Sequence, residues 1–193
     1  MRNFTLFIFL PCCLALLAFA GWDFLSGNRQ LWRAVMLGIV AGLLAVVAYD
    51  VFRLPFVFAK QLGVSSIFPA LNLFKVFPRF GAMILGQPLE QTNYSRAAHF
   101  IGWIYHFSNG ATFGVMYVAL LGDGSRRSWA WGVLMAAGLE LAMLLTPYPH
   151  YFGIEVTLTF VFVTLAAHMI FGSAMGLVVQ RWIRLKRIAS PTP

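Results

Sequence analysis

Long apolar runs separated by short polar or basic segments dominate this chain. Each of five runs reaches the roughly 17 residues that a short membrane-crossing helix needs. They cover about residues 4–22, 31–52, 99–121, 129–145 and 154–179. None shows the strict alternation of apolar and polar residues that a membrane β-strand would require. The pattern predicts an all-α, polytopic membrane helical bundle with five transmembrane helices, formed as a single domain over residues 1–180.

The segment at about 54–88 departs from this pattern. Its apolar patches are interrupted by charged residues and prolines, namely Lys60, Pro69, Lys75, Pro78, Arg79 and Pro88. We expect interfacial helices or a re-entrant segment here, with the basic side chains reaching lipid headgroups. We also expect Pro55 to break the second helix or to begin a new one. A sixth crossing within 54–86 is the alternative.

Composition supports the membrane class. Hydrophobic residues make up 60% of the 193 residues and charged residues only 10%, whereas soluble domains carry about 25% charged residues. The net charge of +8 is concentrated in loops and the tail, where anionic headgroups account for it. The predicted partner is therefore the lipid bilayer and not nucleic acid. Cys12 and Cys13 are adjacent within an apolar run and indicate neither a disulfide framework nor a zinc site.

Basic residues predict the orientation of the helices. The tail at 181–193 carries four of them next to a run, so we expect it to be cytoplasmic. With five crossings, the Arg126-Arg127 turn and the loop holding Arg29 and Arg33 are cytoplasmic as well. Ala18-Phe19-Ala20 is similar to a signal-peptidase site. Cleavage there would leave four crossings and place the basic tail outside, so we expect the first helix to be retained.

A stripe of polar residues and glycines marks the third run. His106, Asn109, Gly110 and Gly114 lie three or four residues apart and share one helical face. The spacing His-x3-Gly-x3-Gly recurs 62 residues later, at His168, Gly172 and Gly176, and Gly38 and Gly42 form a similar pair in the second run. Such glycines let helices pack closely. The two repeated helices run in the same direction, and we expect them to face each other with both imidazoles turned inward.

Five polar residues are predicted to share one half of the bilayer, namely His106, Asn109, Glu140, Asp50 and His168. Buried ionisable groups are costly within a membrane and indicate a functional site. His106, His168 and Glu140 would be an adequate ligand set for a transition metal, and two histidines could be axial to a haem. Under the alternative, the histidines only fix helix packing and Asp50 pairs with Arg53 at the interface.

Three strings carry a resemblance to known proteins: Tyr49-Asp50-x2-Arg53, Tyr105-His106-Phe107-x-Asn109-Gly110-x2-Phe113-Gly114 and the His168 repeat. They resemble uncharacterised bacterial multi-pass inner-membrane protein families with His-x3-Gly-x3-Gly helices. The resemblance covers residues 31–180 and implies the bacterial inner membrane, with the C-terminus cytoplasmic by the charge argument. Those families have no assigned chemistry, so the resemblance implies no catalytic residue.

The function predicted from these features is a buried polar site that binds a metal or haem or relays protons. A small-solute transporter or channel, expected as a homo-oligomer, is one alternative. A non-catalytic subunit or assembly factor of a larger membrane complex is another. No nucleotide-binding loop or nucleophile motif occurs in the sequence, and enzymatic activity is left undecided.

Overall fold

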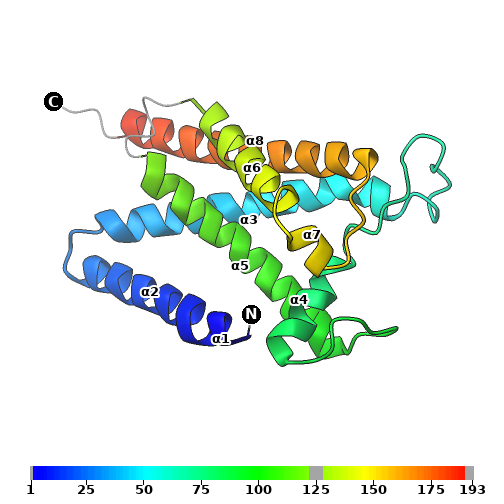
Figure 1. Cartoon of the computed structure of the whole chain (residues 1–193). Helices are drawn as coiled ribbons and strands as arrows, with labels where there is room; N and C mark the ends of the chain where they lie inside the picture. The colour runs from blue at the N-terminus through cyan, green and yellow to red at the C-terminus, as the bar shows by residue number, and fades with distance from the viewer. Residues whose placement is uncertain (1, 122–127, 190–193) are drawn as a thin grey trace.

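The computed structural model describes residues 2–121 and 128–189, with side chains described between residues 3 and 184 (Figure 1). Every regular element in this part of the chain is helical, so the predicted all-α class is confirmed. The elements are α1 (Arg2–Phe4), the π-helical η1 (Thr5–Phe9), α2 (Leu10–Leu25), α3 (Gln30–Val57), α4 (Val76–Leu85), α5 (Arg96–Leu121), α6 (Ala130–Leu144), α7 (Tyr148–Tyr151) and α8 (Leu158–Ala189).

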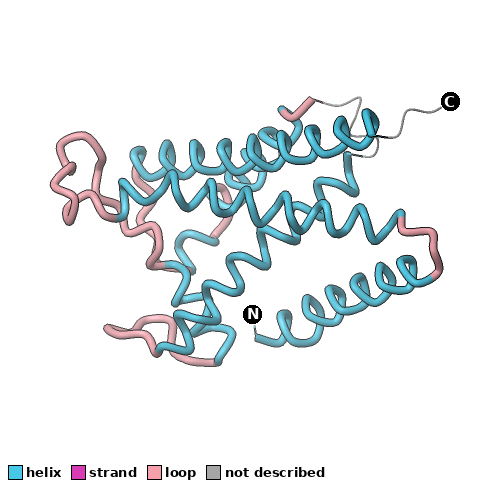
Figure 2. Tube along the Cα trace, turned by 180° about the vertical axis from the view of Figure 1, so that it is seen from behind, coloured by secondary structure: helices cyan, strands magenta, loops and turns pink. Residues whose placement is uncertain are grey.

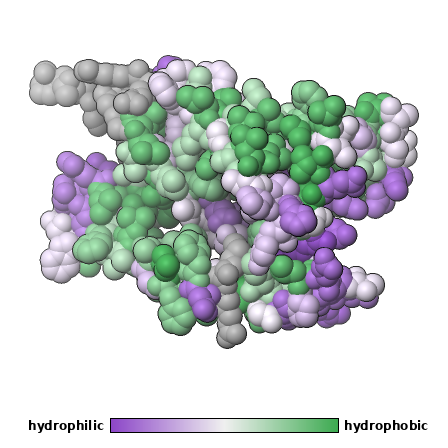
Figure 3. All heavy atoms as spheres, in the orientation of Figure 1, coloured by the Kyte–Doolittle hydropathy of each residue, from purple (hydrophilic) through white to green (hydrophobic). Residues whose placement is uncertain are grey.

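Three helical stretches are long and apolar enough to cross a membrane: Thr5–Leu25, Gln30–Val57 and Leu158–Arg184. At 1.5 Å per residue α3 is about 42 Å long, which exceeds the ~30 Å hydrocarbon core. Hydrophobic residues cover much of the face seen in Figure 3, and hydrophilic residues gather at its ends and around a central hollow. The helix α6 is apolar but shorter, at 15 residues.

Two helices extend beyond the predicted crossings. The helix α3 continues through Pro55 to Val57, because a proline near the C-terminal end of a helix interrupts few backbone hydrogen bonds. The helix α8 extends beyond residue 180 to Ala189 and includes the first residues of the predicted tail, since no glycine or proline lies between Val179 and Ala189. The predicted Arg126-Arg127 turn lies outside the described residues.

The segment at 54–88 folds inward. Its one helix of any length, α4, has 10 residues, or about 15 Å, which is half of a membrane crossing. Phe77, Phe80 and Gly81 of α4 are buried, and the backbones of α4 and α5 touch where Gly81 meets Ala98 and Gly102 meets Phe77. The α4 part of the segment therefore packs into the bundle, while most of residues 60–70 are exposed, and α4 is too short to be a sixth crossing.

Two antiparallel helix pairs, α3 with α5 and α6 with α8, form the centre of the bundle. A β-carbon on Gly38 would lie 2.5 Å from the Cα of Val115, and one on Gly42 would overlap the carbonyl oxygen of Gly110. In the second pair, Gly132 and Gly172 approach so closely that a β-carbon on either would overlap the other's carbonyl oxygen. Glycine is needed at these crossings because the two backbones are in contact.

The two repeated helices α5 and α8 do not pack face to face as expected. The helix α5 packs on α3 and α8 packs on α6, while α3 also contacts α8 and so joins the two pairs. Figures 1 and 2 show α3 and α8 side by side along their length, with α5 crossing α3 obliquely. The expected meeting of the two helices is wrong because each glycine face is already occupied by a different partner helix.

The helix α2 packs against the bundle less extensively than the other long helices do. Only Ala20 of α2 is buried, and α2 packs against α3 after a turn in which Gly27 has a φ of +86°. The Asp23 carboxylate accepts a hydrogen bond of 3.1 Å from the backbone N–H of Trp32. This carboxylate satisfies one of the free N–H groups at the start of α3.

Candidate functional site

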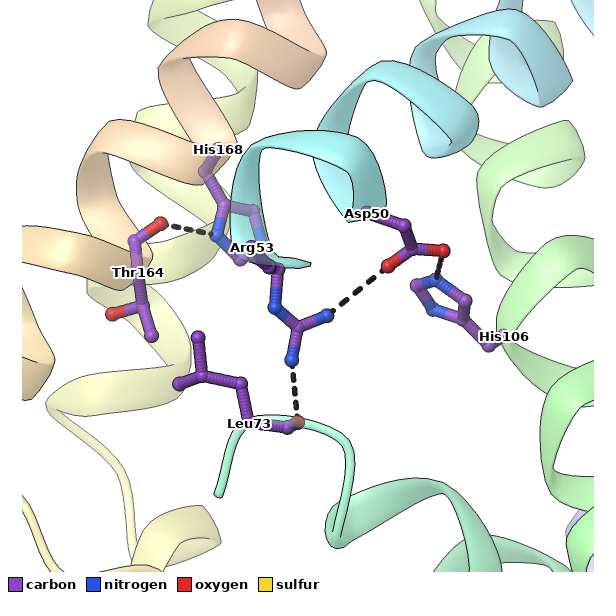
Figure 4. A network of polar contacts seen from close by, with 6 residues as sticks. All are labelled: Asp50, Arg53, Leu73, His106, Thr164 and His168. Carbon is purple, nitrogen blue, oxygen red and sulfur yellow. Dashed lines mark hydrogen bonds and ion pairs between the residues drawn. The ribbon is translucent and has the colours of Figure 1, made fainter. Parts of the chain in front are cut away.

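Two carboxylate–histidine pairs lie inside the bundle. Asp50 Oδ2 of α3 is 3.0 Å from His106 Nε2 of α5, and Glu140 Oε2 of α6 is 3.2 Å from His168 Nδ1 of α8. Figure 4 shows Asp50 between His106 and Arg53, with His168 nearby. The Glu140 side chain is only 4% exposed. Four of the five predicted polar residues are thus brought together, in two pairs.

The two pairs are built in the same way. Each carboxylate follows a glycine at the helix crossing by eight residues, Gly42 before Asp50 and Gly132 before Glu140, and each histidine precedes its own crossing glycine by four. The two helices of each pair are antiparallel. A carboxylate that follows one crossing glycine and a histidine that precedes the other therefore lie on the same side of the helix crossing. The sequence analysis identified the His-x3-Gly spacing on one helix of each pair. It missed the glycine that precedes a carboxylate by eight residues on the other helix, although this spacing can also be read from the sequence.

Hydrogen-bond geometry decides which nitrogen of each imidazole carries a proton. Nδ1 of His168 lies 2.9 Å from the carbonyl oxygen of Thr164. A carbonyl oxygen only accepts, so Nδ1 donates, and Nε2 of the neutral ring is left as an acceptor. In the other pair, Nε2 of His106 donates to the Asp50 carboxylate. A carboxylate held in this way orients an imidazole and increases its basicity.

A buried arginine joins the first pair. Arg53 is 3% exposed, and its Nη1 donates to Asp50 Oδ1 at 3.3 Å while Nη2 donates to the Leu73 carbonyl. Its guanidinium carbon lies 4.6 Å from the ring centroid of Tyr49, a cation–π contact. The expected pair with Asp50 forms, but Arg53 lies in the protein interior and not among headgroups. Its Nε has no hydrogen-bond partner within the described part of the chain.

The two histidines differ in what covers them. Phe77 of α4 stacks on His106 with ring centroids 4.2 Å apart, and Trp103 contacts the same ring at 5.7 Å. Tyr49 contacts both imidazoles, at 6.0 Å from His106 and 5.0 Å from His168. Aromatic rings therefore cover part of His106, whereas His168 lines an open space, although the two side chains are similarly exposed, at 14% and 15%.

That space is a cavity of about 390 Å³ between α3, α4, α6, α7 and α8. Its polar lining includes Tyr49, Arg53, Lys75, Arg79, Glu140, Tyr148, Glu155, Thr164 and His168. Burial raises the pKa of Tyr148, so its hydroxyl stays protonated and can donate a hydrogen bond. The Glu140–His168 pair therefore has access to a cavity large enough for water or a small ligand.

The predicted metal site is not assembled as one ligand set. Among the described residues no three His, Cys, Asp or Glu side chains lie together in a way that would hold a metal ion. His106 is paired with Asp50 and does not join Glu140 and His168. Asn109 belongs to neither pair.

No family model matches this sequence, and no match to a curated protein or a solved structure was found. The resemblance to bacterial inner-membrane families therefore stays a prediction. The fold itself defines a helical protein with three helices suited to a membrane. Within it, two antiparallel helix pairs of similar construction each carry one carboxylate–histidine pair, partly exposed except for Glu140, which is buried.

Proposed function

We propose that this chain is an integral membrane protein whose Glu140–His168 pair takes up and releases protons at the cavity. The observation that carries the proposal is that a glutamate with a 4% exposed side chain contacts a cavity-lining histidine at 3.2 Å. Buried ionisable groups in membrane helices are expensive, and they commonly mark proton or ion pathways.

The geometry supports a relay through the imidazole. A proton from the cavity would bind the acceptor nitrogen Nε2 of His168. The Nδ1 proton, which donates to the Thr164 carbonyl in this structure, would then move to the Glu140 carboxylate 3.2 Å away. Glu140 would then pass the proton on toward the opposite side of the bundle, so that a proton gradient can drive flux through the pair. Tyr49 lies against both imidazoles, so the Asp50–His106 pair is near enough to alter the charge balance of the first pair.

The proposal includes the arrangement in the membrane. The crossings would be α2, α3, α5, α6 and α8, in a bacterial inner membrane with the C-terminus in the cytoplasm. The helix α6 would be about 22 Å long, so the bilayer would thin locally around it. In this orientation both pairs and the cavity lie in the outer half of the membrane.

Proton flux into liposomes tests the proposal. Purified protein would be reconstituted with a trapped pH-sensitive dye, and a potassium gradient with valinomycin would drive protons inward. We expect Glu140→Gln and His168→Gln to slow acidification about tenfold or more. Glu90→Gln and His150→Gln, at exposed positions outside this cavity, are the controls. Wild-type flux equal to that of empty liposomes, or full flux in Glu140→Gln, would contradict the proposal.

The cavity also favours a small-solute carrier as a second candidate, because ligand sites are concave and combine apolar walls with few polar groups. In a carrier, the same pair would couple the movement of protons to that of the solute. Proton movement that occurs only when the solute is present would separate this candidate from the first.

A further inference from the structure

We propose that the cavity binds the anionic group of a small amphipathic molecule through Arg79 and Lys75, which both line it. The binding itself is independent of the proposed function, and only its coupling to protons rests on that function. The shared chemistry is a carboxylate or phosphate group attached to an apolar body.

Unmatched positive charge points to an anion. Arg53 also lines the cavity, but its guanidinium is already paired with Asp50 and the Leu73 carbonyl. Among the described residues, the Arg79 guanidinium donates only to neutral acceptors, the Phe152 carbonyl and the Tyr94 hydroxyl. Lys75 is exposed and has no carboxylate partner among the described residues. Buried guanidinium groups form their strongest hydrogen bonds with carboxylates and phosphates.

Two carboxylates also line the cavity, but they do not reverse this preference. Glu140 is already paired with His168, and Glu155 is exposed to solvent, where its field is screened. The protonated Tyr148 hydroxyl adds a neutral donor. The cavity therefore offers an incoming group more donors than unpaired acceptors, which favours an anion over a cation.

Size and wall chemistry define the rest of the ligand. A volume of about 390 Å³ is at the lower end of the range for small-molecule pockets. Apolar side chains also line it, including Leu71, Leu144, Ile154 and Phe160. These features fit a small organic acid or the headgroup end of an anionic lipid.

An anion in the cavity would favour proton uptake by the neighbouring pair. The groups facing Glu140 and His168 are Tyr49 and Arg53 of α3 and Tyr148 of α7, and His106 lies beyond Tyr49. A second negative charge beside Glu140 disfavours its ionised form. One proton would then enter with the anion, and the Glu140–His168 pair would hold it.

Calorimetric titration of the purified full-length protein with benzoate tests binding. We expect Lys75→Gln and Arg79→Gln each to weaken benzoate binding about tenfold, since each removes a charged donor. Lys60→Gln, an exposed lysine outside the cavity, should bind like the wild type. Benzylammonium, of similar size and opposite charge, should not bind.

A second arm distinguishes the sources of the anion. Native mass spectrometry with added phosphatidylglycerol would show a retained lipid that Arg79→Gln loses, if the lipid is the occupant. Wild-type binding of either benzoate or phosphatidylglycerol, weakened in Lys75→Gln and Arg79→Gln, supports the proposal. Binding of neither probe, equal binding in these two variants, or preference for benzylammonium overturns it.

The coupling between benzoate binding and proton uptake is measured in a separate experiment. Titrations in two buffers with different ionisation enthalpies report the protons taken up with each benzoate. We expect Glu140→Gln to keep benzoate binding and to lose this proton uptake. If benzoate binds and its proton uptake does not depend on Glu140, the coupling is overturned and the anion site stands. If protons cross the liposome membrane but neither benzoate nor lipid binds, the anion site alone is overturned.

Discussion

The glycine crossing between α6 and α8 allows a comparison within one helix. Gly132 and Gly138 both lie on α6, six residues apart. A β-carbon on Gly132 would overlap the carbonyl oxygen of Gly172, whereas one on Gly138 would meet nothing within 4 Å. Gly132→Ala and Gly138→Ala therefore make the same chemical change at a packed and at an open position.

The magnitude follows from the distances. An ordinary contact needs about 3.5 Å, so Gly132→Ala would force α6 and α8 apart by about 1 Å, and overpacking of this kind costs about 1–3 kcal/mol. Gly138→Ala should instead gain up to about 1 kcal/mol from helix propensity. The same separation would stretch the 3.2 Å contact between Glu140 and His168 beyond hydrogen-bond range.

Thermal unfolding in detergent, followed by size-exclusion chromatography of heated samples, measures the difference between the two variants. We expect Gly132→Ala to unfold at a clearly lower temperature than the wild type and Gly138→Ala at an equal or higher one. If Gly132→Ala were as stable as Gly138→Ala, the two backbones could not be in contact at this crossing, and the geometry that brings Glu140 to His168 would be wrong.

Asp50→Asn should destabilise the protein by about 3–5 kcal/mol in denaturant titrations, because it leaves the buried Arg53 without its charge partner. The double variant Asp50→Asn/Arg53→Met should recover part of that loss, and no recovery would contradict the pairing. A double-mutant cycle of Glu140→Gln and His168→Gln should give a coupling energy of about 0.5–3 kcal/mol, and a value of zero would exclude their contact. Asp23→Ala should cost about 1 kcal/mol through the unsatisfied N–H at the start of α3, with Asp23→Asn costing less in the same unfolding assay.

Local patterns were sufficient to predict the elements of this fold. Apolar runs predicted α2, α3, α5, α6 and α8 because burial in lipid or protein needs continuous hydrophobic surface. Helical periodicity also placed His106 and Gly110 on one face, since residues three or four apart share a face. The direction of each helix and the position of each residue along it were enough to predict that Glu140 lies near a histidine.

The identity of each contact could not be predicted in the same way. Glycine spacing shows that a helix approaches a neighbour closely, but it does not say which neighbour, so α5 was expected to face α8. Arg53 illustrates a second limit. Its sequence neighbours suggest an ion pair at the membrane interface. The guanidinium is buried because the chain folds back and places the Leu73 carbonyl and the rings of Phe74 and Phe77 against it.

The connections between helices explain why two similarly built pairs have different surroundings. Residues 58–95 join α3 to α5 and include α4, which places Phe77 on His106. The connection from α6 to α8 covers only residues 145–157 and contains the four-residue α7. The longer connection therefore covers the first pair, whereas the shorter one leaves His168 and Glu140 open to the cavity. On this argument the Asp50–His106 pair, with Arg53, chiefly holds α3 and α5 together, and exchange of protons or ligand is confined to the second pair.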